Sequence, residues 1–442
     1  MANKISPEAA DAEYHLKEGE HHLVKISGSL LKDPGMKDIV SDLQKIAARG
    51  IKITIVCGAG AQNTGKMESY LQSQGLEYKP EMVEGVRKTS KEELENAVIP
   101  VNREIRALMK ELLPDANVLT PQQIHCTQVA SLGYTGEPQE IEGLDDNNIT
   151  VVCSVGVDGE QPLNINATGI ARAVTAQGHL DEVFLVTSTG GVLHKGDIAK
   201  LLFTEDFDTD GHHKRVNIQG GMQNNTKEAN LMLEHVDRVV ITSIDGIRKE
   251  LEGVLGYGTM VVKKSSLRCE HICGDDEIEI YKTLFHEGVS SGDFKSRTDE
   301  EFKELLKYAY TIKVGSSVLA AFALVPKGAW TELSTICSGY NGSGIGDVIL
   351  QAAQAELLRE EEEEGNKKEK REKMYAFASS RDSVGLFTRN YFENLGPVSE
   401  LKKEHNSFYD YLQCVKGYDT SKRGCDPCFC TWYKGIDDVR RF

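Results

Sequence analysis

The sequence predicts an α/β protein made of two successive units, and two observations carry this prediction. Up to residue 262, short β-branched apolar runs alternate with amphipathic stretches, and the runs end in loops that contain glycine. This pattern is typical of a parallel sheet covered by helices. After residue 262, helices lead into an antiparallel hairpin and then a strand that runs into a glycine-rich turn. The second pattern indicates a mixed sheet.

The first unit is defined by apolar runs and two helical patterns. Apolar residues recur at helical spacing over residues 36–47. Ser90 and Glu93 form the pattern of a capping box, which starts a helix through Asn102. We expect this unit to span residues 21–262, after an N-terminal arm at 1–20. The predicted strands cover residues 22–27, 51–57, 149–154, 183–188 and 238–242.

The second unit is expected over residues 276–420, after a linker at 263–275. Its hairpin turns at Gly315, and a charged stretch at 360–373 is typical of a helix extension or a surface loop. Residues 421–442 are expected to form a cysteine-rich tail. The predicted helices are 277–286, 299–308, 345–359 and 384–391, and the predicted strands are 310–314, 318–325, 332–338 and 374–378.

Composition and charge exclude several classes of protein. The 442 residues include 51 Lys and Arg against 68 Asp and Glu, a formal charge of −17. An acidic chain without a basic cluster is not expected to bind nucleic acid. The longest apolar run, residues 318–325, is shorter than the roughly 20 residues that cross a bilayer. Because the N-terminus has no signal or transit pattern, we expect a cytoplasmic protein; an organellar one stays open if a transit peptide is missing from this chain.

The cysteines predict neither a disulfide scaffold nor a metal site. Ten cysteines in 442 residues are too few for a disulfide-stabilised protein. Cys425, Cys428 and Cys430 cluster in the tail, and two more cysteines flank His271. Four thiolates can build a zinc site, but no pattern brings the two groups together. We therefore expect no bound metal and a loosely packed tail with free thiols.

Three glycine-bearing loops follow predicted strands of the first unit, at residues 25–29, 58–62 and 187–191. Parallel sheets bind ligands at the carboxyl ends of their strands, where backbone amides and a cation can hold an anion. Lys25 ends the first predicted strand. The sequence therefore predicts a phosphate cradle, although each glycine alone can simply close a turn.

Six motifs in a fixed order give the first unit a family resemblance. They are Lys25-x-x-Gly28, a glycine-rich loop ending at Gln62, residues 85–89, residues 163–167, residues 220–222 and residues 256–259. This order resembles the amino-acid kinase family, and most of all its N-acetylglutamate kinases, over residues 20–262. The resemblance implies an α/β/α sandwich. It also implies that the kinase site survives in part, at Lys25, Gly28, Gly58, Gly60, Arg87 and Asn164.

Departures from the family pattern bear on activity. Thr168 stands where the family has an aspartate that organises the phosphate-binding lysines. Asn225 stands where the family has a transition-state lysine, and Lys227 follows two residues later. Phosphoryl transfer depends on positioned charge, so losing both groups removes much of the transition-state stabilisation. We therefore expect a regulatory domain and no kinase activity.

Residues 250–259 resemble the arginine-binding segment of arginine-sensitive family members. The resemblance implies that Glu250 pairs with the guanidinium, a planar partner that suits a carboxylate, and that Gly256 contributes to the same site. L-Arginine is then the expected effector, and a homo-oligomer formed through this domain is the expected assembly. The alternative is that Glu250 is an ordinary surface residue before a glycine-rich turn.

The second unit carries a glycine-rich loop between a strand and a helix. The amides of such a loop and of a helix N-terminus bind pyrophosphate. The pattern resembles the loop that binds acetyl-CoA in the GNAT acetyltransferases, with Asn341 in place of the usual basic residue or glutamine. An ordinary strand–turn–helix is the alternative. The resemblance implies an acetyl-CoA site at Ile336, Ser338, Asn341, Gly342, Gly344 and Gly346.

The rest of the second unit resembles N-acetylglutamate synthases. The similar stretches are residues 381–383, 387–392, 400–403 and 408–416, with 295–297 upstream; Gln413 replaces an arginine of the family. A kinase-like domain followed by an acetyltransferase is also the architecture of that family. The resemblance implies acetyl transfer to L-glutamate, the first step of arginine biosynthesis. Acetyl-CoA is then a co-substrate, and no tightly bound cofactor is expected.

Acetyl transfer needs a base that takes a proton from the attacking ammonium group. Glu332, on a strand near the expected acetyl position, is the candidate base; a structural strand-end glutamate is the alternative. Tyr340 and Tyr409 are candidate donors to the thiolate leaving group. Cations that pair with the glutamate carboxylates are expected among Arg381, Lys295 and Arg297, although each is also readable as a solvated surface cation.

Two other functions stay open on the sequence alone. Both site patterns depart from those of their families, which leaves a non-catalytic, arginine-sensing subunit. The kinase motifs leave a bifunctional N-acetylglutamate kinase and synthase. Parallel assays of CoA release and of ADP release separate all three.

Overall fold

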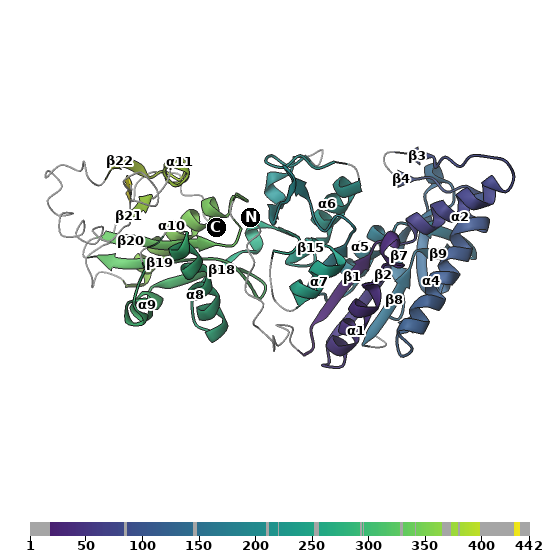
Figure 1. Ribbon diagram of the computed structural model, residues 1–442, viewed down its shortest axis with the longest axis horizontal. Helices are drawn as coiled ribbons and strands as arrows, with labels where there is room; N and C mark the ends of the chain where they lie inside the picture. The colour runs from purple at the N-terminus through teal and green to yellow at the C-terminus, as the bar shows by residue number, and fades with distance from the viewer. Residues whose placement is uncertain are drawn as a thin grey trace. The chain divides into compact units, whose positions relative to one another are not determined.

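The computed structural model of the protein divides into two compact units, Met1–Lys263 and Lys264–Phe442, each described by itself (Figure 1). Among the residues that the structure describes, no helix is long and apolar enough to span a bilayer. In the same part of the chain, no three His, Cys, Asp or Glu side chains gather to hold a metal ion. The described residues are 18–83, 86–144, 148–208, 212–219, 221–251, 256–291, 294, 296–327, 330–340, 342–364, 373–378, 381–397 and 428–433.

An eight-stranded sheet forms the centre of the first unit. Neighbouring strands run parallel except for one antiparallel pair, β15 with β16. The five predicted strands are confirmed, whereas the short edge strands have too few residues to show a readable period. The order is β14 (Leu201–Phe203), β16 (Thr259–Val262), β15 (Arg238–Thr242), β11 (Glu182–Val186), β1 (His21–Ile26), β2 (Lys52–Cys57), β8 (Ile149–Cys153) and β5 (Asn117–Val118).

Helices cover both faces of this sheet, which confirms the predicted α/β/α sandwich (Figure 1). Along β1, Leu23 belongs to one apolar core, while Val24 and Ile26 belong to the other. Burial on both faces explains why the central strands are continuous apolar runs. The helices of one face are α1 (Met36–Ala47), α4 (Ile99–Leu112) and α7 (Ile244–Leu251), and those of the other are α5 (Ala167–Gln177) and α6 (Gly221–Met232).

A closed four-stranded barrel leads into α5 and is not apparent from the sequence. Polar residues interrupt its strands, so the alternation that would reveal them is weak. Gly156 allows two strands to approach closely, since an added Cβ there would lie 2.4 Å from the carbonyl oxygen of Ile124. The strands are β6 (Ile124–Gln128), β7 (Thr135–Ile141), β9 (Val155–Asp158) and β10 (Gln161–Ile165).

The helical segment that begins after Ser90 differs from its sequence pattern. Ser90 Oγ accepts a hydrogen bond from the N–H of Glu93 at 3.1 Å, as expected of a helix cap. The Glu93 carboxylate, however, pairs with Arg87, so the helix has a serine cap in place of the predicted capping box. The segment consists of α3 (Lys91–Glu93), a π-helical turn (Leu94–Val98) and α4.

A seven-stranded mixed sheet forms the second unit, in agreement with the predicted mixed α/β class. All its neighbouring strands are antiparallel except β20 and β21, which are parallel. The order is β17 (Arg268–His271), β18 (Ala309–Val314), β19 (Ser317–Lys327), β20 (Trp330–Ser338), β21 (Lys373–Ala378), β23 (Cys428–Tyr433) and β22 (Glu393–Pro397).

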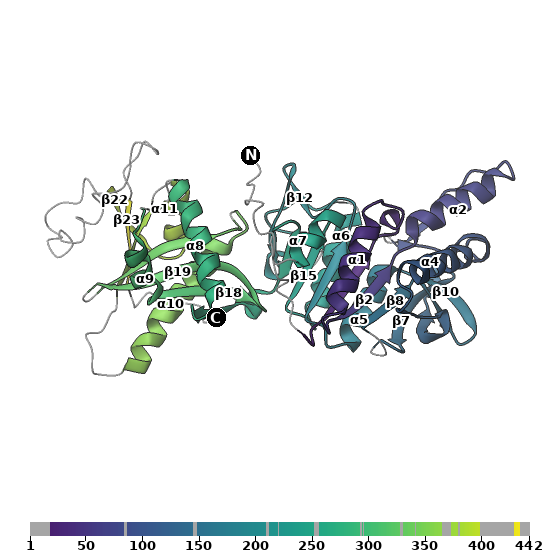
Figure 2. The same ribbon diagram turned by 60° about the horizontal axis from the view of Figure 1, so that its bottom comes forward.

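Helices pack on this second sheet (Figure 2). Tyr281 and Phe285 of α8 join Phe302 of α9 in one apolar cluster over Ala321 and Ala323 of β19. Small residues on β19 let the aromatic side chains approach the sheet. The helices are α8 (Asp275–Ser290), α9 (Asp299–Leu306), α10 (Ile345–Glu364) and α11 (Arg381–Arg389).

Two segments differ from their predicted roles. Within the predicted linker at 263–275, residues Arg268–His271 form β17, the edge strand beside β18. Within the predicted loose tail, residues Cys428–Tyr433 form β23, which lies between β21 and β22. The aromatic and β-branched residues of this segment favour a strand. Cys425 lies outside the described residues.

Candidate functional site

A cleft of about 360 Å³ opens in the first unit, where loops follow β1 and β2. Six of the eight residues predicted as the remnant of a kinase site line this cleft, namely Lys25, Gly28, Gly58, Gly60, Arg87 and Asn164, whereas Thr168 and Asn225 do not. None of the described residues that line it is acidic. The topology therefore brings the predicted site together, at the edge of the sheet where parallel sheets bind ligands.

Two of these glycines bring backbone segments into close approach. A Cβ added at Gly28 would lie 2.8 Å from the carbonyl oxygen of Gly58, and one added at Gly58 would lie 3.1 Å from the nitrogen of Gly28. Gly60 differs, because a Cβ there would meet nothing within 4 Å; this residue begins α2 (Gly60–Gln72). Gly28 and Gly58 are thus required by space, and Gly60 is not.

Lys25 is a buried cation that faces the cleft. Its Nζ donates a hydrogen bond to Ser27 Oγ at 3.2 Å. Burial lowers the pKa of Lys25 to about 8, and no carboxylate among the described lining residues opposes that effect. An anion entering the cleft would therefore find a positive charge that the protein has not already neutralised.

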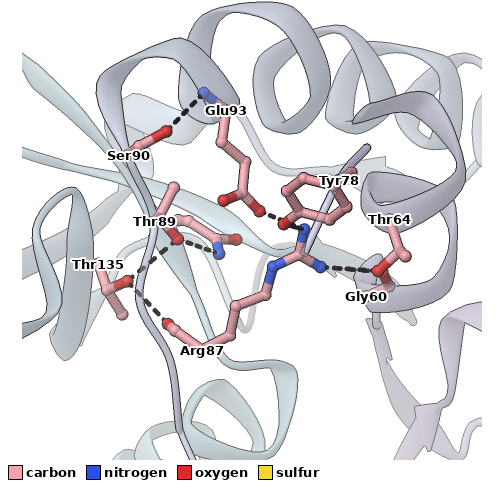
Figure 3. Close-up of polar contacts among 9 residues, drawn as sticks. Gly60, Thr64, Tyr78, Arg87, Thr89, Ser90, Glu93 and Thr135 are labelled. Atoms are coloured by element: carbon pink, nitrogen blue, oxygen red, sulfur yellow. Dashed lines mark hydrogen bonds and ion pairs between the residues drawn. The ribbon is translucent and has the colours of Figure 1, made fainter. Parts of the chain in front are cut away.

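Arg87 is held by the protein itself (Figure 3). Its guanidinium donates to Thr64 Oγ1 at 2.9 Å and to the carbonyl of Gly60 at 3.4 Å. It also pairs with the Glu93 carboxylate and donates to the hydroxyl of Tyr78, whose ring centroid lies 5.4 Å away. Burial, followed by the charge of Glu93, raises the pKa of Tyr78 to about 12. Arg87 therefore acts as a structural cation that joins α2, β4 (Val86–Arg87) and α3.

A row of hydroxyl and amide groups continues from Arg87 along the cleft. Asn164 Nδ2 donates to Thr89 Oγ1 at 2.9 Å, and Thr135 Oγ1 donates to the same oxygen at 3.1 Å. Thr89 is fully buried. These bonds fix the barrel strand that carries Asn164 against the segment that carries Arg87.

The two substituted kinase positions lie away from the described lining of the cleft. Thr168 is buried in the first turn of α5, where its N–H donates to Asn166 Oδ1 at 2.9 Å. Asn225 is half-buried in α6, and Lys227 on the same helix is exposed. Neither residue of α6 is among the lining residues, so Lys227 does not supply the missing charge in this conformation.

Glu250, at the end of α7, is buried and holds the turn that follows. Its Oε1 accepts hydrogen bonds from the N–H groups of Gly256 at 3.1 Å and Tyr257 at 3.0 Å. Its Oε2 is buried and has no hydrogen-bond partner among the described residues. Burial raises the pKa of Glu250 to about 7, against the opposing charge of Arg238. The surface alternative is wrong, because Glu250 is only 3 % exposed.

The second unit has an opening where β20 and β21 separate. The parallel pairing covers Trp330 with Lys373, Thr331 with Met374 and Glu332 with Tyr375, and then stops. β20 continues to Ser338 and β21 to Ala378. Ile336 and Ser338 thus lie on a stretch of β20 for which the described residues show one strand neighbour, β19.

Glu332 lies at the vertex of this opening. It belongs to the last pair before the strands part, and it is half-buried. The hydroxyl of Tyr375 donates to Glu332 Oε2 at 3.4 Å. Glu332 is thus the last residue of β20 that pairs with β21.

The glycine-rich turn leads from β20 to α10. Ser338 Oγ accepts from the N–H of the buried Tyr340 at 3.0 Å. Gly342 and Gly344 have φ of +81° and +94°, values that other residues rarely adopt. At Gly346 the small side chain is favoured by packing, since an added Cβ would lie 2.9 Å from the Leu386 side chain.

The other predicted residues of the second unit are placed in part. Arg297 donates to Ser334 Oγ of β20 at 3.4 Å. Arg381 begins α11, and its side chain lies outside what the structure describes, as do Lys295, Asn341 and Tyr409.

Comparisons with known proteins agree with this arrangement. Residues 22–243 match the Amino acid kinase family. An acetylglutamate kinase of Geobacillus sp. (strain WCH70) is 31 % identical over 201 residues, 41 % of this chain and 74 % of the relative. An acetylglutamate kinase of Clostridioides difficile (strain 630) is 27 % identical over 227 residues, 46 % of this chain and 76 % of the relative.

Two solved structures share the fold of both units. An N-acetylglutamate synthase from Neisseria gonorrhoeae, complexed with coenzyme A and L-arginine, superposes with a TM-score of 0.57 at 15 % identity, covering 95 % of this chain and 96 % of that one. The same enzyme with coenzyme A and N-acetyl-glutamate gives 0.51 at 16 % identity, covering 96 % of each chain. The chain thus shares the fold of that synthase, and through residues 22–243 it belongs to the amino acid kinase family.

Proposed function

We propose that the protein is an N-acetylglutamate synthase, which transfers an acetyl group from acetyl-CoA to the α-amino group of L-glutamate. One observation carries the proposal: β20 and β21 part after Glu332, and a turn with Gly342 and Gly344 leads from that opening into α10. The backbone of β20 after Glu332 can pair with an extended pantetheine arm, and the N-terminus of α10 can bind the pyrophosphate. The fold shared with a synthase solved with coenzyme A supports the same assignment.

In the proposed reaction, Glu332 takes part in the chemical step, and the glycine-rich turn binds the pyrophosphate of acetyl-CoA. The ammonium group of glutamate gives a proton to Glu332, directly or through water. The neutral amine attacks the thioester carbonyl and a C–N bond forms. As the C–S bond breaks, the nitrogen gives up its second excess proton to water, which restores the proton that the tyrosine donor passes to the thiolate. The CoA thiolate then takes up a proton, for which Tyr340 and Tyr409 are the proposed donors. The amides of Gly342 and Gly344 hold the pyrophosphate.

Cations select the dicarboxylate substrate. Arg297, which contacts β20 through Ser334, and Arg381, at the start of α11, are proposed to pair with the two carboxylates, with Lys295 beside Arg297. A charge-assisted hydrogen bond contributes about 1.5–3 kcal/mol. Arg381→Ala is therefore expected to raise the KM for glutamate more than the KM for acetyl-CoA.

The first unit is proposed to sense L-arginine and not to transfer phosphate. Glu250 offers a buried carboxylate oxygen without a hydrogen-bond partner in the described part of the chain, beside Gly256 of the following turn. A guanidinium supplies both the charge and the hydrogen bond that this oxygen lacks. Inhibition and activation both remain compatible with such a site.

The test measures two reactions with the full chain. With acetyl-CoA and L-glutamate, we expect release of free CoA, which a thiol reagent measures. We also expect formation of N-acetylglutamate, which mass spectrometry detects. With ATP and N-acetylglutamate, we expect no ADP. D-Glutamate serves as the matched control substrate, because its charges are the same and its α-amino group is misplaced.

Each other outcome assigns a different function. ADP release with the second pair, alone or with CoA release, would establish the kinase or the bifunctional enzyme. Arginine binding by calorimetry without either reaction would establish a non-catalytic sensor. CoA release that does not depend on glutamate would contradict the proposed substrate.

A further inference from the structure

Thr335 interrupts the regular geometry of β20. Ser334 pairs with Ala323 of β19, and Cys337 pairs with Ala321. Two residues of β20, Thr335 and Ile336, therefore stand opposite a single residue of β19, which defines a β-bulge. Thr335 has φ of +50°, a strained value for a β-branched residue. A strained backbone of this kind persists only where its surroundings hold it.

Tyr281 of α8 supplies that support. Its phenol is hydrogen-bonded to the hydroxyl of Thr335, and both groups are buried. The Tyr281 ring packs against that of Phe302, with 5.5 Å between the centroids. Burial raises the pKa of Tyr281 far above its usual value, so the phenol keeps its proton and can donate. A side chain fixed by packing thus fixes the Thr335 side chain.

The bulge lies at the proposed acetyl site. It comes three residues after Glu332, on the stretch of β20 from which β21 has separated. A bulge leaves one residue outside the hydrogen-bond ladder and redirects its peptide groups. The peptide N–H groups of Thr335 and Ile336 lie three and four residues after the proposed base, and their direction depends on the bulge.

We infer that Tyr281 is a positioning residue for acetyl transfer: through Thr335, it aims a peptide N–H of the bulge at the acetyl carbonyl oxygen. The inference rests on the proposed function. As the amine attacks, negative charge develops on that oxygen, and a directed N–H stabilises it. Tyr281 neither gains nor loses a proton. Its contribution is confined to the transition state, because the ground-state carbonyl carries less charge.

The first variant is Tyr281→Phe, which removes one hydroxyl and keeps the ring. Loss of a whole oxyanion donor costs about 100- to 1,000-fold in kcat, so loosening one is expected to lower kcat about 10-fold. The KM values for acetyl-CoA and glutamate should stay within about twofold. Thr335→Val removes the other half of the hydrogen bond and should give the same fall.

Combinations separate positioning from general destabilisation. Because the two hydroxyls act as one unit, Tyr281→Phe with Thr335→Val should cost no more than either change alone. Thr335→Ser keeps the hydroxyl and should retain nearly full activity. Thr335→Gly adopts positive φ without strain, so adding Tyr281→Phe to it should have little further effect. Thr311→Val, which removes a buried hydroxyl from β18, is the matched control and should not change kcat.

The outcomes distinguish this inference from the proposed function. An active wild type with an unchanged kcat in folded Tyr281→Phe overturns the inference alone, as does a change confined to KM. If Tyr281→Phe does not fold, equal activity of Thr335→Val and Thr335→Ser overturns it. A wild type that releases no CoA overturns the proposed function, and this inference with it.

Discussion

The kinase-like cleft and the opening between β20 and β21 both lie beside glycine-rich turns, but they differ in how their polar groups are satisfied. In the cleft, the guanidinium of Arg87 is already bound by Glu93, Tyr78 and Thr64 (Figure 3). In the opening, β20 continues past Glu332 to Ser338, and the described residues show no pairing with β21 along that stretch. The Glu332 carboxylate accepts a hydrogen bond from the hydroxyl of Tyr375.

The cleft holds polar groups of both kinds, because the protein satisfies the Arg87 guanidinium, whereas no described lining residue neutralises the charge of Lys25. The cleft keeps the close glycine approach at Gly28 and Gly58, which the packing of the loops requires. The charges at positions 168 and 225 are absent, and the remaining guanidinium serves the fold. A polar group that is satisfied internally stabilises structure, whereas one left open is available for chemistry.

The largest expected effect is a loss of kcat on substitution of Glu332, the carboxylate at the opening. Glu332→Gln keeps the shape of the side chain but cannot accept a proton, so kcat should fall about 100- to 10,000-fold. The KM for acetyl-CoA should stay within about threefold, because the cofactor contacts are unchanged. Steady-state kinetics from pH 6 to 9 checks this. An unchanged kcat would assign Glu332 to structure alone.

The second prediction tests the claim that Arg87 is structural. Glu93→Gln leaves the half-buried guanidinium of Arg87 without its carboxylate partner, which should lower the free energy of unfolding by about 2–3 kcal/mol. The control is Glu81→Gln, which breaks the exposed 2.9 Å pair with Lys88 and should cost less than about 0.5 kcal/mol. Urea unfolding measures both. Equal effects would mean that Arg87 is free to serve a ligand.

The third prediction concerns the glycine-rich turn. Gly344→Asp places a negative charge where the pyrophosphate is expected, and the KM for acetyl-CoA should rise about 10- to 100-fold. Gly315→Asp is the matched control, because Gly315 also has positive φ, +54°, and lies in the hairpin turn between β18 and β19. If both variants change the KM equally, backbone strain and not charge is responsible.

The fourth prediction concerns the pH dependence that Glu250 gives to stability. Its pKa of about 7 in the folded protein lies above the usual value near 4.3. The folded state is therefore favoured while the carboxyl is protonated, and stability falls as pH rises from about 4.5 to above 7, by at most about 4 kcal/mol. Glu250→Gln should remove this loss, which thermal unfolding at pH 5 and pH 8 measures.

A second experiment on Glu250 measures how L-arginine changes the thermal stability at two pH values. The guanidinium needs the ionised carboxylate, so arginine should stabilise the wild type more at pH 8 than at pH 5.5 and should not stabilise Glu250→Gln. A binding coupling of this kind is typically about 1–3 kcal/mol. The exposed Glu234→Gln is the control and should respond as the wild type does. Arginine stabilisation of Glu250→Gln would place the effector elsewhere.

Apolar patterning predicts the sandwich well, because its central strands and α1 are buried in regular periods. The barrel escapes prediction, since the closeness of its strands depends on glycines such as Gly156 and not on alternation. β23 escapes because its partners, β21 and β22, precede it by a long segment without a clear period. Strand formation there depends on pairing that no local pattern records.

The candidate sites divide in the same way. Two of the three glycine loops line the cleft, and the third, at residues 187–191, is not among its lining residues. The partner of Arg87 is not predictable, because Glu93 fits a capping box equally well in the sequence. The bulge at Thr335 is not predictable from the sequence either, since the pattern of residues 332–338 is typical of an uninterrupted strand. Contacts between distant side chains decide both features.

The place of β23 in the second sheet sets an order for making the protein. A ribosome releases β21 and β22 before residues 428–433 exist, yet β23 lies between those two strands and pairs with both. During synthesis, each of them must wait with an unpaired edge. Such non-local pairing slows folding and exposes edges that can pair with other chains. The second unit therefore completes its sheet late, and chaperone demand during translation should fall on this unit more than on the first.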